Sequence, residues 1–263
     1  MNKRITFLIA FSAVAILPAL AQAQRKSPLA DAPAIRKKVE LRSLRLEFGG
    51  GGGTTLNQDF YHSVFVNLKL GFHITDWLSL SGFGAFTVAS LETGFQDRVK
   101  ETLPTANPSI PREPTAQQAV DSMSKISQIL AAQLEFVPFT GKYSLFGSLF
   151  AHYDFYAFAG PGFLNIKPTD AGLGPCDDAA AARSCGVSGL KLGANVGLGV
   201  HSYINDFLAL DLVLRDIIAQ INPAGRDVNG DGRANASDLK WGSTYMVSLN
   251  LVLYLPSTAD ISL

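Results

Sequence analysis

The sequence predicts an all-β protein: an eight-stranded antiparallel up-and-down transmembrane β-barrel with short periplasmic turns and long extracellular loops. Three observations indicate this fold class. They are an N-terminal export signal, apolar residues that alternate with small or polar ones, and connections that alternate in length. The chain after the signal has no apolar run long enough for a spanning helix, so we expect any membrane crossing to be made by strands.

Residues 1–23 are predicted to be a signal peptide. Lys3 and Arg4 precede an apolar run, and Ala21-Gln22-Ala23 has the small-x-small pattern of a cleavage site. Pro18 and the shortness of the run favour cleavage over the alternative, an uncleaved membrane anchor. The remaining chain is divided into a flexible periplasmic linker at 24–38, an outer-membrane β-barrel at 39–255 and a C-terminal tail at 256–263.

Alternation of period two is clearest in residues 64–74, where Val66, Leu68 and Leu70 share one face and Asn67 and Lys69 share the other. Comparable runs recur along the chain, and the length of many of them is close to the ten or so residues that a tilted strand needs to cross a bilayer. We expect strands near residues 41–48, 64–74, 77–88, 129–137, 145–159, 190–201, 207–215 and 245–255.

The connections between these strands alternate in length. Tight links are expected at 75–76, 138–142 and 205–206, and long ones at 89–127, 160–189 and 217–241. Short turns on one side and long loops on the other are typical of outer-membrane barrels. Within the long first loop, the spacing of residues 116–131 predicts a helical turn or two that merges into the fourth strand.

Residues 49–59 are predicted to be a link of intermediate length. Gly49 to Gly53 is interpreted as a flexible hairpin loop, because no helix or phosphate-binding lysine motif follows it.

A soluble calycin-like ligand-binding barrel is the alternative fold, since it shows the same alternation with the apolar face turned around a cavity. Polar faces rich in Gly, Ser and Asn with few charges favour a crowded interior over a solvated exterior. Aromatic residues near the predicted strand ends also fit interfacial girdles. They are Phe60, Tyr61, Trp77, Phe139, Tyr143, Tyr203, Phe207, Trp241 and Tyr245.

Several segments resemble a known family. Pro138-Phe139, Gly141 to Ser144, His152 to Tyr156 and Gly160 to Gly162 are similar to segments of the small outer-membrane β-barrel proteins of myxobacteria and related delta-proteobacteria, and residues 73–78 resemble their early turn. The resemblance implies an outer-membrane location and carries no catalytic residues. Leu263 departs from the aromatic terminal residue usual in such barrels.

The sharpest motif is residues 227–238, which resemble a dockerin-type calcium loop. Oxygen-bearing side chains fall at positions 1, 3, 5, 9 and 12 of a twelve-residue loop, with Gly232 at position 6. The predicted calcium ligands are Asp227, Asn229, Asp231, Arg233 through its carbonyl, Asn235 and Asp238. The alternative is a turn-rich loop without a metal.

The only cysteines, Cys176 and Cys185, lie close together in a predicted extracellular loop. We expect a local disulfide, because an exported protein folds in an oxidising setting. A two-cysteine metal site is the alternative, although no histidine or third cysteine lies nearby in the sequence.

Charged residues on the non-apolar strand faces predict a network inside the barrel, because an eight-stranded bore is filled by side chains that must pair. They are Arg45, Glu47, Lys69, Glu135, Asp154, Lys191, Asp211 and Arg215, with His73, His152 and His201 nearby. The functional alternatives are a narrow proton or ion path and a hydrolytic site on His152 and Asp154. We find no nucleophile elbow, HExxH or cofactor motif.

Formal charge is balanced, with 22 basic and 22 acidic residues, and gives no argument for nucleic-acid binding. We therefore expect a non-enzymatic barrel of a Gram-negative outer membrane, with lipid as its partner and a structural or surface-interaction role. A small-solute pore and a lipid-handling envelope enzyme are the alternatives.

Overall fold

The structure is a computed structural model that describes residues 40–103, 115–145, 149–168, 189–224, 228, 230, 236–257 and 260–261. The chain divides into two compact units, one of residues 40–260 and the other of residues 1–39 with 261–263. The first unit contains the whole β-barrel.

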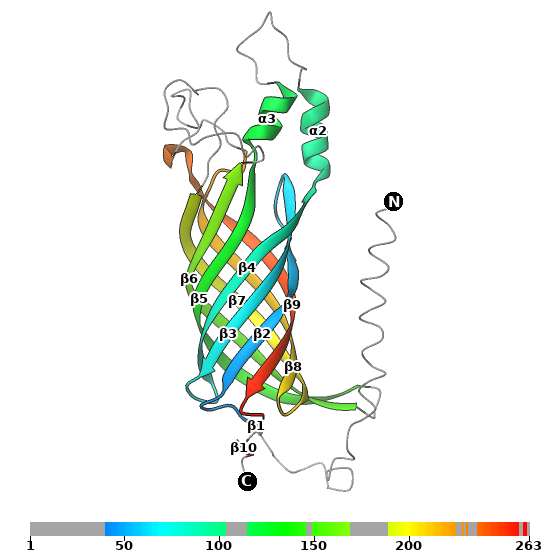
Figure 1. Ribbon diagram of the computed structural model, residues 1–263, viewed down its shortest axis with the longest axis vertical. Helices are drawn as coiled ribbons and strands as arrows, with labels where there is room; N and C mark the ends of the chain where they lie inside the picture. Colours follow the sequence, from blue (N-terminus) through cyan, green and yellow to red (C-terminus); the bar gives the residue numbers. More distant parts are fainter. Residues whose placement is uncertain are drawn as a thin grey trace, which may run out of the picture. The chain divides into compact units, whose positions relative to one another are not determined.

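Eight antiparallel strands form a closed barrel in chain order, with the last strand hydrogen-bonded to the first (Figure 1). This confirms the predicted fold class. The strands are β2 (Leu46–Thr55), β3 (Tyr61–His73), β4 (Leu78–Glu92), β5 (Ser124–Leu145), β6 (Leu149–Pro168), β7 (Gly189–Asn205), β8 (Leu208–Ile221) and β9 (Lys240–Leu255). Two-residue strands β1 (Glu40–Leu41) and β10 (Asp260–Ile261) are not part of the barrel.

The two ends of the barrel differ. At the end that we call the turn end, residues 74–77 join β3 to β4, and Asp206-Phe207 joins β7 to β8. At the opposite end, the loop end, the β4–β5 connection contains helices α2 (Gly94–Thr102) and α3 (Ala116–Ser122). Helix α3 leads directly into β5, in agreement with the helical turn predicted from residue 116. The β8–β9 connection contains a short 3-10 helix, η2 (Ala236–Asp238).

The glycine run 49–53 was predicted to be a loop, and this prediction is wrong. These residues lie inside β2 and are paired on both sides, with Gly51 opposite Asn67 of β3 and Asn250 of β9. A Cβ atom on Gly51 would overlap the carbonyl oxygen of Leu249. Glycine therefore lets the first strand approach the last one closely enough to close the barrel.

The tight turn predicted at 138–142 is also wrong. Pro138 lies within β5, at a register irregularity between Phe136 and Phe139. Proline has no N–H to donate to a ladder, and a bulge accommodates it. The ladder between β4 and β5 ends where Leu78 of β4 lies opposite Phe136 of β5, so Pro138 interrupts no hydrogen bond to β4.

Side chains alternate between the bore and the outer wall. On β3, Asn67 and Lys69 are 2% and 3% exposed, whereas Leu68 is 64% exposed. The same pattern on all eight strands covers the wall with apolar side chains, which we call the apolar belt. Its members include Phe48, Leu68, Leu70, Leu80, Leu134, Leu198, Leu212, Leu249 and Leu251.

The aromatic residues predicted at the strand ends separate into two main groups. Residues of an interfacial girdle must be exposed on the outer wall. Trp77, Phe139, Phe207, Trp241 and Tyr245 are exposed, while Tyr143 is half-buried. Phe60, Tyr61 and Tyr203 are buried, which corrects their assignment to the girdle. Strand parity turns Tyr61 and Tyr203 toward the interior, where Tyr203 packs near Tyr254 with ring centroids 5.5 Å apart, whereas Phe60 precedes β3 and packs with Val120 and Met123.

We predict that Gly51→Ala destabilises the folded barrel by about 1–3 kcal/mol, because the new methyl group overlaps the β9 backbone. Gly82→Ala is the matched control, since a Cβ atom there meets nothing within 4 Å. Urea unfolding of both refolded variants, followed by heat-modifiable migration on gels, measures the difference. Equal stability of the two variants would contradict the closure role of Gly51.

Candidate functional site

Buried side chains line the bore along its length. In the half nearer the turn end lies a group of six buried ionisable residues, which we call the ionic core. It consists of Glu47, Lys69, His73, Glu135, His201 and Asp211. These residues come from five of the eight strands, β2, β3, β5, β7 and β8. A sixth strand, β6, contributes Tyr156, whose hydroxyl group donates a 2.8 Å hydrogen bond to Asp211 Oδ1.

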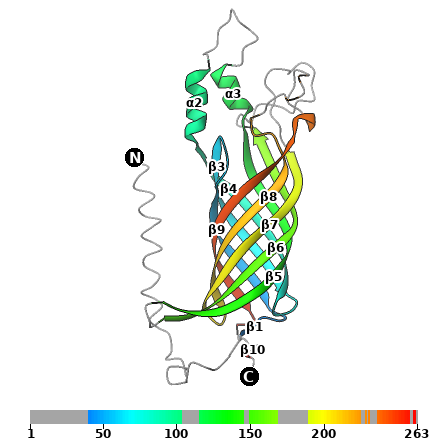
Figure 2. The same cartoon turned by 180° about the vertical axis from the view of Figure 1, so that it is seen from behind.

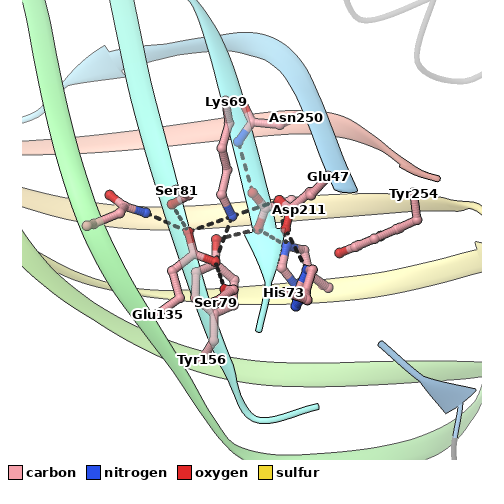
Figure 3. Close-up of polar contacts among 12 residues, drawn as sticks. Glu47, Lys69, His73, Ser79, Ser81, Glu135, Tyr156, Asp211, Asn250 and Tyr254 are labelled. Atoms are coloured by element: carbon pink, nitrogen blue, oxygen red, sulfur yellow. Dashed lines mark hydrogen bonds and ion pairs between the residues drawn. The ribbon is translucent and has the colours of Figure 1, made fainter. Parts of the chain in front are cut away.

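Lys69 is the central cation of the ionic core. Its Nζ atom lies 2.8 Å from Glu47 Oε1 and 2.9 Å from Glu135 Oε1, so one ammonium group bridges two carboxylates from different strands (Figure 3). All three side chains are at most 3% exposed. A charge at that depth is stable only when it is paired and hydrogen-bonded, so the three groups depend on one another.

Glu135 receives additional hydrogen bonds from neutral donors. Ser79 and Ser81 of β4 donate their hydroxyl groups, at 3.1 Å and 2.5 Å, and Gln133 Nε2 donates at 2.7 Å. These donors supply what a buried carboxylate needs beyond one ion pair. The serines on the inner face of β4 therefore belong to the network.

Two histidines lie on the turn side of Lys69. His73 Nε2 is 3.1 Å from Glu47 Oε2, and His201 Nε2 lies 3.5 Å from Asp211 Oδ1. The His201 ring stacks on Tyr156, with centroids 4.6 Å apart. A Cβ atom on Gly199 would overlap the Tyr156 ring, so this glycine makes room for the ring inside the bore.

Arg215 lies on the loop side of the ionic core. Its Nη1 atom donates hydrogen bonds to Gln133 Oε1 at 2.7 Å and to Asn195 Oδ1 at 2.5 Å. The guanidinium group also lies over the rings of Phe83 and Phe158, at 3.9 Å and 4.5 Å from their centroids. Cation–π contacts and neutral amides thus take the place of a carboxylate partner.

An apolar cluster fills the bore beyond Arg215. It is built from inward-facing side chains of β3, β4, β5, β6, β8 and β9, which are at most 7% exposed. Its members are Phe65, Phe83, Ala85, Ile126, Ile129, Ala131, Leu164, Ile166, Ile217, Ala219 and Met246. A smaller cluster of Phe60, Tyr61, Val120 and Met123 lies at the loop end, next to α3.

The segment before β2 covers the turn end, and we call residues 42–45 the N-terminal turn. Arg42 Nη1 forms a 2.5 Å ion pair with Asp154 of β6, and Arg45 Nη2 donates to the carbonyl oxygens of Asp206 and Pro256. Arg42 was not among the predicted site residues. It lies within the run expected near 41–48, where its parity places it with Leu44 and Leu46 on the outer face. The turn at Ser43 and Leu44, with Leu44 at a φ of 63°, brings its side chain to the end of the bore instead.

Of the predicted interior residues, the structure buries Arg45, Glu47, Lys69, Glu135, Asp154, Asp211 and Arg215. Lys191 has the same inward parity on β7 but is only half-buried, and it lies toward the loop end. The predicted hydrolytic pair shares one face of β6, but Asp154 is paired with Arg42, and His152 lies opposite Lys142 beyond the ladder with β7.

Among the predicted calcium ligands, only Asp238 lies within the described residues. It is 2% exposed, and its Oδ1 atom accepts a 2.8 Å hydrogen bond from the backbone N–H of Val228. Asp227, Asn229, Asp231, Arg233 and Asn235 lie outside the described residues, as do Cys176 and Cys185. In the part of the chain that is described, no three His, Cys, Asp or Glu side chains are grouped to hold a metal ion.

No family model and no curated protein matches the chain. Within the described ranges, no helix is long and apolar enough to span a membrane. Solved structures of other β-barrels are similar, among them two outer-membrane proteins. The outer membrane protein OprG from Pseudomonas aeruginosa has a TM-score of 0.40 and 11% identity, over 81% of this chain and 97% of that one. A major outer membrane protein from Thermus thermophilus has a TM-score of 0.37 and 12% identity, over 80% of this chain and 99% of that one.

We predict that Lys69→Met destabilises the barrel by about 3–5 kcal/mol, because it leaves two buried carboxylates without their shared cation. Lys100→Met is the matched control, since Lys100 pairs with Glu92 at 2.9 Å on the exposed surface. A surface ion pair contributes little, so the control variant should unfold close to the unmodified protein. Urea titrations of both variants test this, and a small effect of Lys69→Met would contradict the central role of the lysine.

Proposed function

We propose that this chain is an outer-membrane β-barrel with a closed bore and a structural or surface-contact role, and that it is neither an enzyme nor a pore. The observation that carries the proposal is the distribution of side chains across the barrel wall. Apolar residues face outward along every strand, and the ion pairs face inward. Lipid is the solvent for which this distribution is favourable.

The outer wall supports a membrane location. Burying one Leu or Phe side chain is favourable by about 1.5–3 kcal/mol, and the belt exposes many of them next to one another. Soluble monomers rarely expose apolar patches of that extent. The closed strand order also satisfies the backbone hydrogen-bonding groups along the wall, which a hydrocarbon environment demands.

The same distribution argues against a soluble ligand-binding barrel. Such a barrel needs an apolar cavity inside and a charged exterior. Here the bore holds Lys69 between two carboxylates, whereas positions such as Leu68 and Leu251 face outward at 64% and 51% exposure.

The contents of the bore argue against a pore. The N-terminal turn covers the turn end, the ionic core fills the bore next to it, and the apolar cluster lies beyond the ionic core. Ions would have to cross the apolar cluster without a polar partner, at a high desolvation cost. By the asymmetry of outer-membrane barrels, the turn end faces the periplasm and the loop end with α2 and α3 faces outside.

We predict that a fluorescent label at Leu251→Cys, in a protein whose native cysteines are replaced by serine, is quenched by lipids that carry a quencher on their acyl chains. A label at Asn57→Cys, an exposed position in the β2–β3 connection, is the control and should be quenched only from water. Planar bilayers containing the unmodified protein should show no stable channels. If the label at Leu251 is shielded from water but is not quenched by lipid, the membrane proposal is wrong. Steady conductance in the bilayers would show that the bore is not closed.

We further propose that the β8–β9 connection binds calcium through residues 227–238. The motif supports this, and so does the hydrogen bond between Val228 and Asp238, which brings the two ends of the loop together. The ion would brace a long loop outside the membrane, where weak affinity suffices. The disulfide between Cys176 and Cys185 stays a prediction of the sequence.

Calorimetric titration of the refolded barrel with calcium should show one weak site, and Asp231→Ala should remove it because position 5 of the loop loses its carboxylate. Asp59→Ala, which alters an exposed carboxylate in the β2–β3 connection, is the control and should bind as the unmodified protein does. Binding that survives Asp231→Ala would show that the calcium site lies elsewhere.

A further inference from the structure

Strands β5 and β6 extend beyond the rest of the barrel at the turn end. Their ladder continues from Phe139 opposite Phe155 to Leu145 opposite Leu149. The β4–β5 ladder ends at Leu78 opposite Phe136, and the β6–β7 ladder ends at Tyr153 opposite Ser202. We call residues 137–145 and 149–155 the β5–β6 ribbon. Figures 1 and 2 show it projecting sideways from the barrel.

The two faces of the described part of the ribbon differ in chemistry. The face that continues the outer wall carries Phe139 opposite Phe155 and Tyr143 next to Tyr153, with ring centroids 6.4 Å and 6.0 Å apart. The opposite face carries the polar pairs Thr140 with Asp154 and Lys142 with His152.

The aromatic face is continuous with the apolar belt. Phe136, the last belt residue of β5, is 48% exposed and contacts Trp77 edge-on at 5.7 Å between centroids. Phe139 follows it along the same wall and is 67% exposed. The hydroxyl group of Tyr143 hydrogen-bonds to Ser202 on the outer face of β7. This contact keeps the aromatic face of the ribbon on the same side as the outer wall of the barrel. The medium that surrounds the apolar belt near the turn end therefore also contacts the aromatic face of the ribbon.

The open edges of the ribbon determine its depth. The N–H group of Val137 still donates to the carbonyl oxygen of Trp77, but from Pro138 onward β5 has no ladder partner on its β4 side. Residues 149–152 of β6 have none on the β7 side, among the strands that the structure describes. Open sheet edges do not occur in the hydrocarbon core, because water cannot reach their N–H and C=O groups there. The headgroup region provides water for the edges and apolar depth for aromatic rings.

We propose that the β5–β6 ribbon is an interfacial anchor that lies on the periplasmic leaflet, with its aromatic face in the phospholipid headgroup region and its polar face toward water. This inference rests on the proposed membrane location. Lys142 on the polar face is exposed, and a long lysine side chain at the headgroup region can extend its ammonium group to lipid phosphates. The ribbon thereby extends lipid contact beyond the circumference of the barrel.

Single-tryptophan reporters test the anchor in the full-length refolded protein. In a Trp77→Phe, Trp241→Phe background, one tryptophan is placed at Phe139 on the aromatic face, at Thr140 on the polar face or at Leu251 in the belt. The probes are phosphatidylcholine–phosphatidylglycerol vesicles brominated near the headgroup end of the acyl chains, and iodide in the water.

We expect Phe139→Trp to have blue-shifted emission and to lose most of it to brominated lipid, and Thr140→Trp to lose its emission to iodide instead. If Phe139→Trp responds only to iodide while Leu251→Trp is quenched by lipid, the anchor is wrong and the barrel assignment stands. If Phe139→Trp is protected from both quenchers, the face is covered by protein, such as a second copy, and the anchor is again wrong. If lipid quenches neither Phe139→Trp nor Leu251→Trp, the membrane location itself fails.

Discussion

Closure of β9 onto β2 is the constraint on which the rest of the structure depends. Only a closed ladder gives every strand two neighbours, and only then do eight inner faces converge on one bore. The glycines of β2 are part of this constraint, because a side chain at Gly51 would occupy the place of the β9 backbone. The glycine run of β2, which has no side chains, thus allows the first and last strands of the sheet to pair.

The interior follows from the opposite demands on the two sides of the wall. The outer face is mostly apolar, with Asp216 of β8 as a charged exception, and most charged residues in the middle of the strands lie inside, where each needs a partner. Lys69 meets this need by bridging Glu47 and Glu135, and Arg215 meets it with amide oxygens and aromatic rings. The two cations have different partners because their surroundings differ. Lys69 lies among carboxylates nearer the turn end, whereas Arg215 borders the apolar cluster.

The sequence predicted the strand count, the face of each clear strand and the helical turn of α3, because long alternating runs carry that information residue by residue. It failed where residues carry little or ambiguous information. Gly49 to Gly53 have no side chains to assign to a face, and Pro138 suggests a turn unless the end of the β4 ladder is known. Interior charges were predictable from parity, but pairing Lys69 with Glu135 depends on the register of separate strands. The role of Arg42 depends on three-dimensional contacts alone.

The N-terminal turn joins parts of the chain that are far apart in sequence. The backbone N–H groups of Arg42 and Ser43 donate to Asp76, Arg42 pairs with Asp154, and Arg45 reaches the carbonyl groups of Asp206 and Pro256. These contacts need the first, middle and final strands to be in place together, so we expect them to form late in assembly. Interactions that are absent from the folding transition state slow unfolding more than they speed folding. We therefore expect the N-terminal turn to slow unfolding and so to lengthen the lifetime of a barrel that has already assembled.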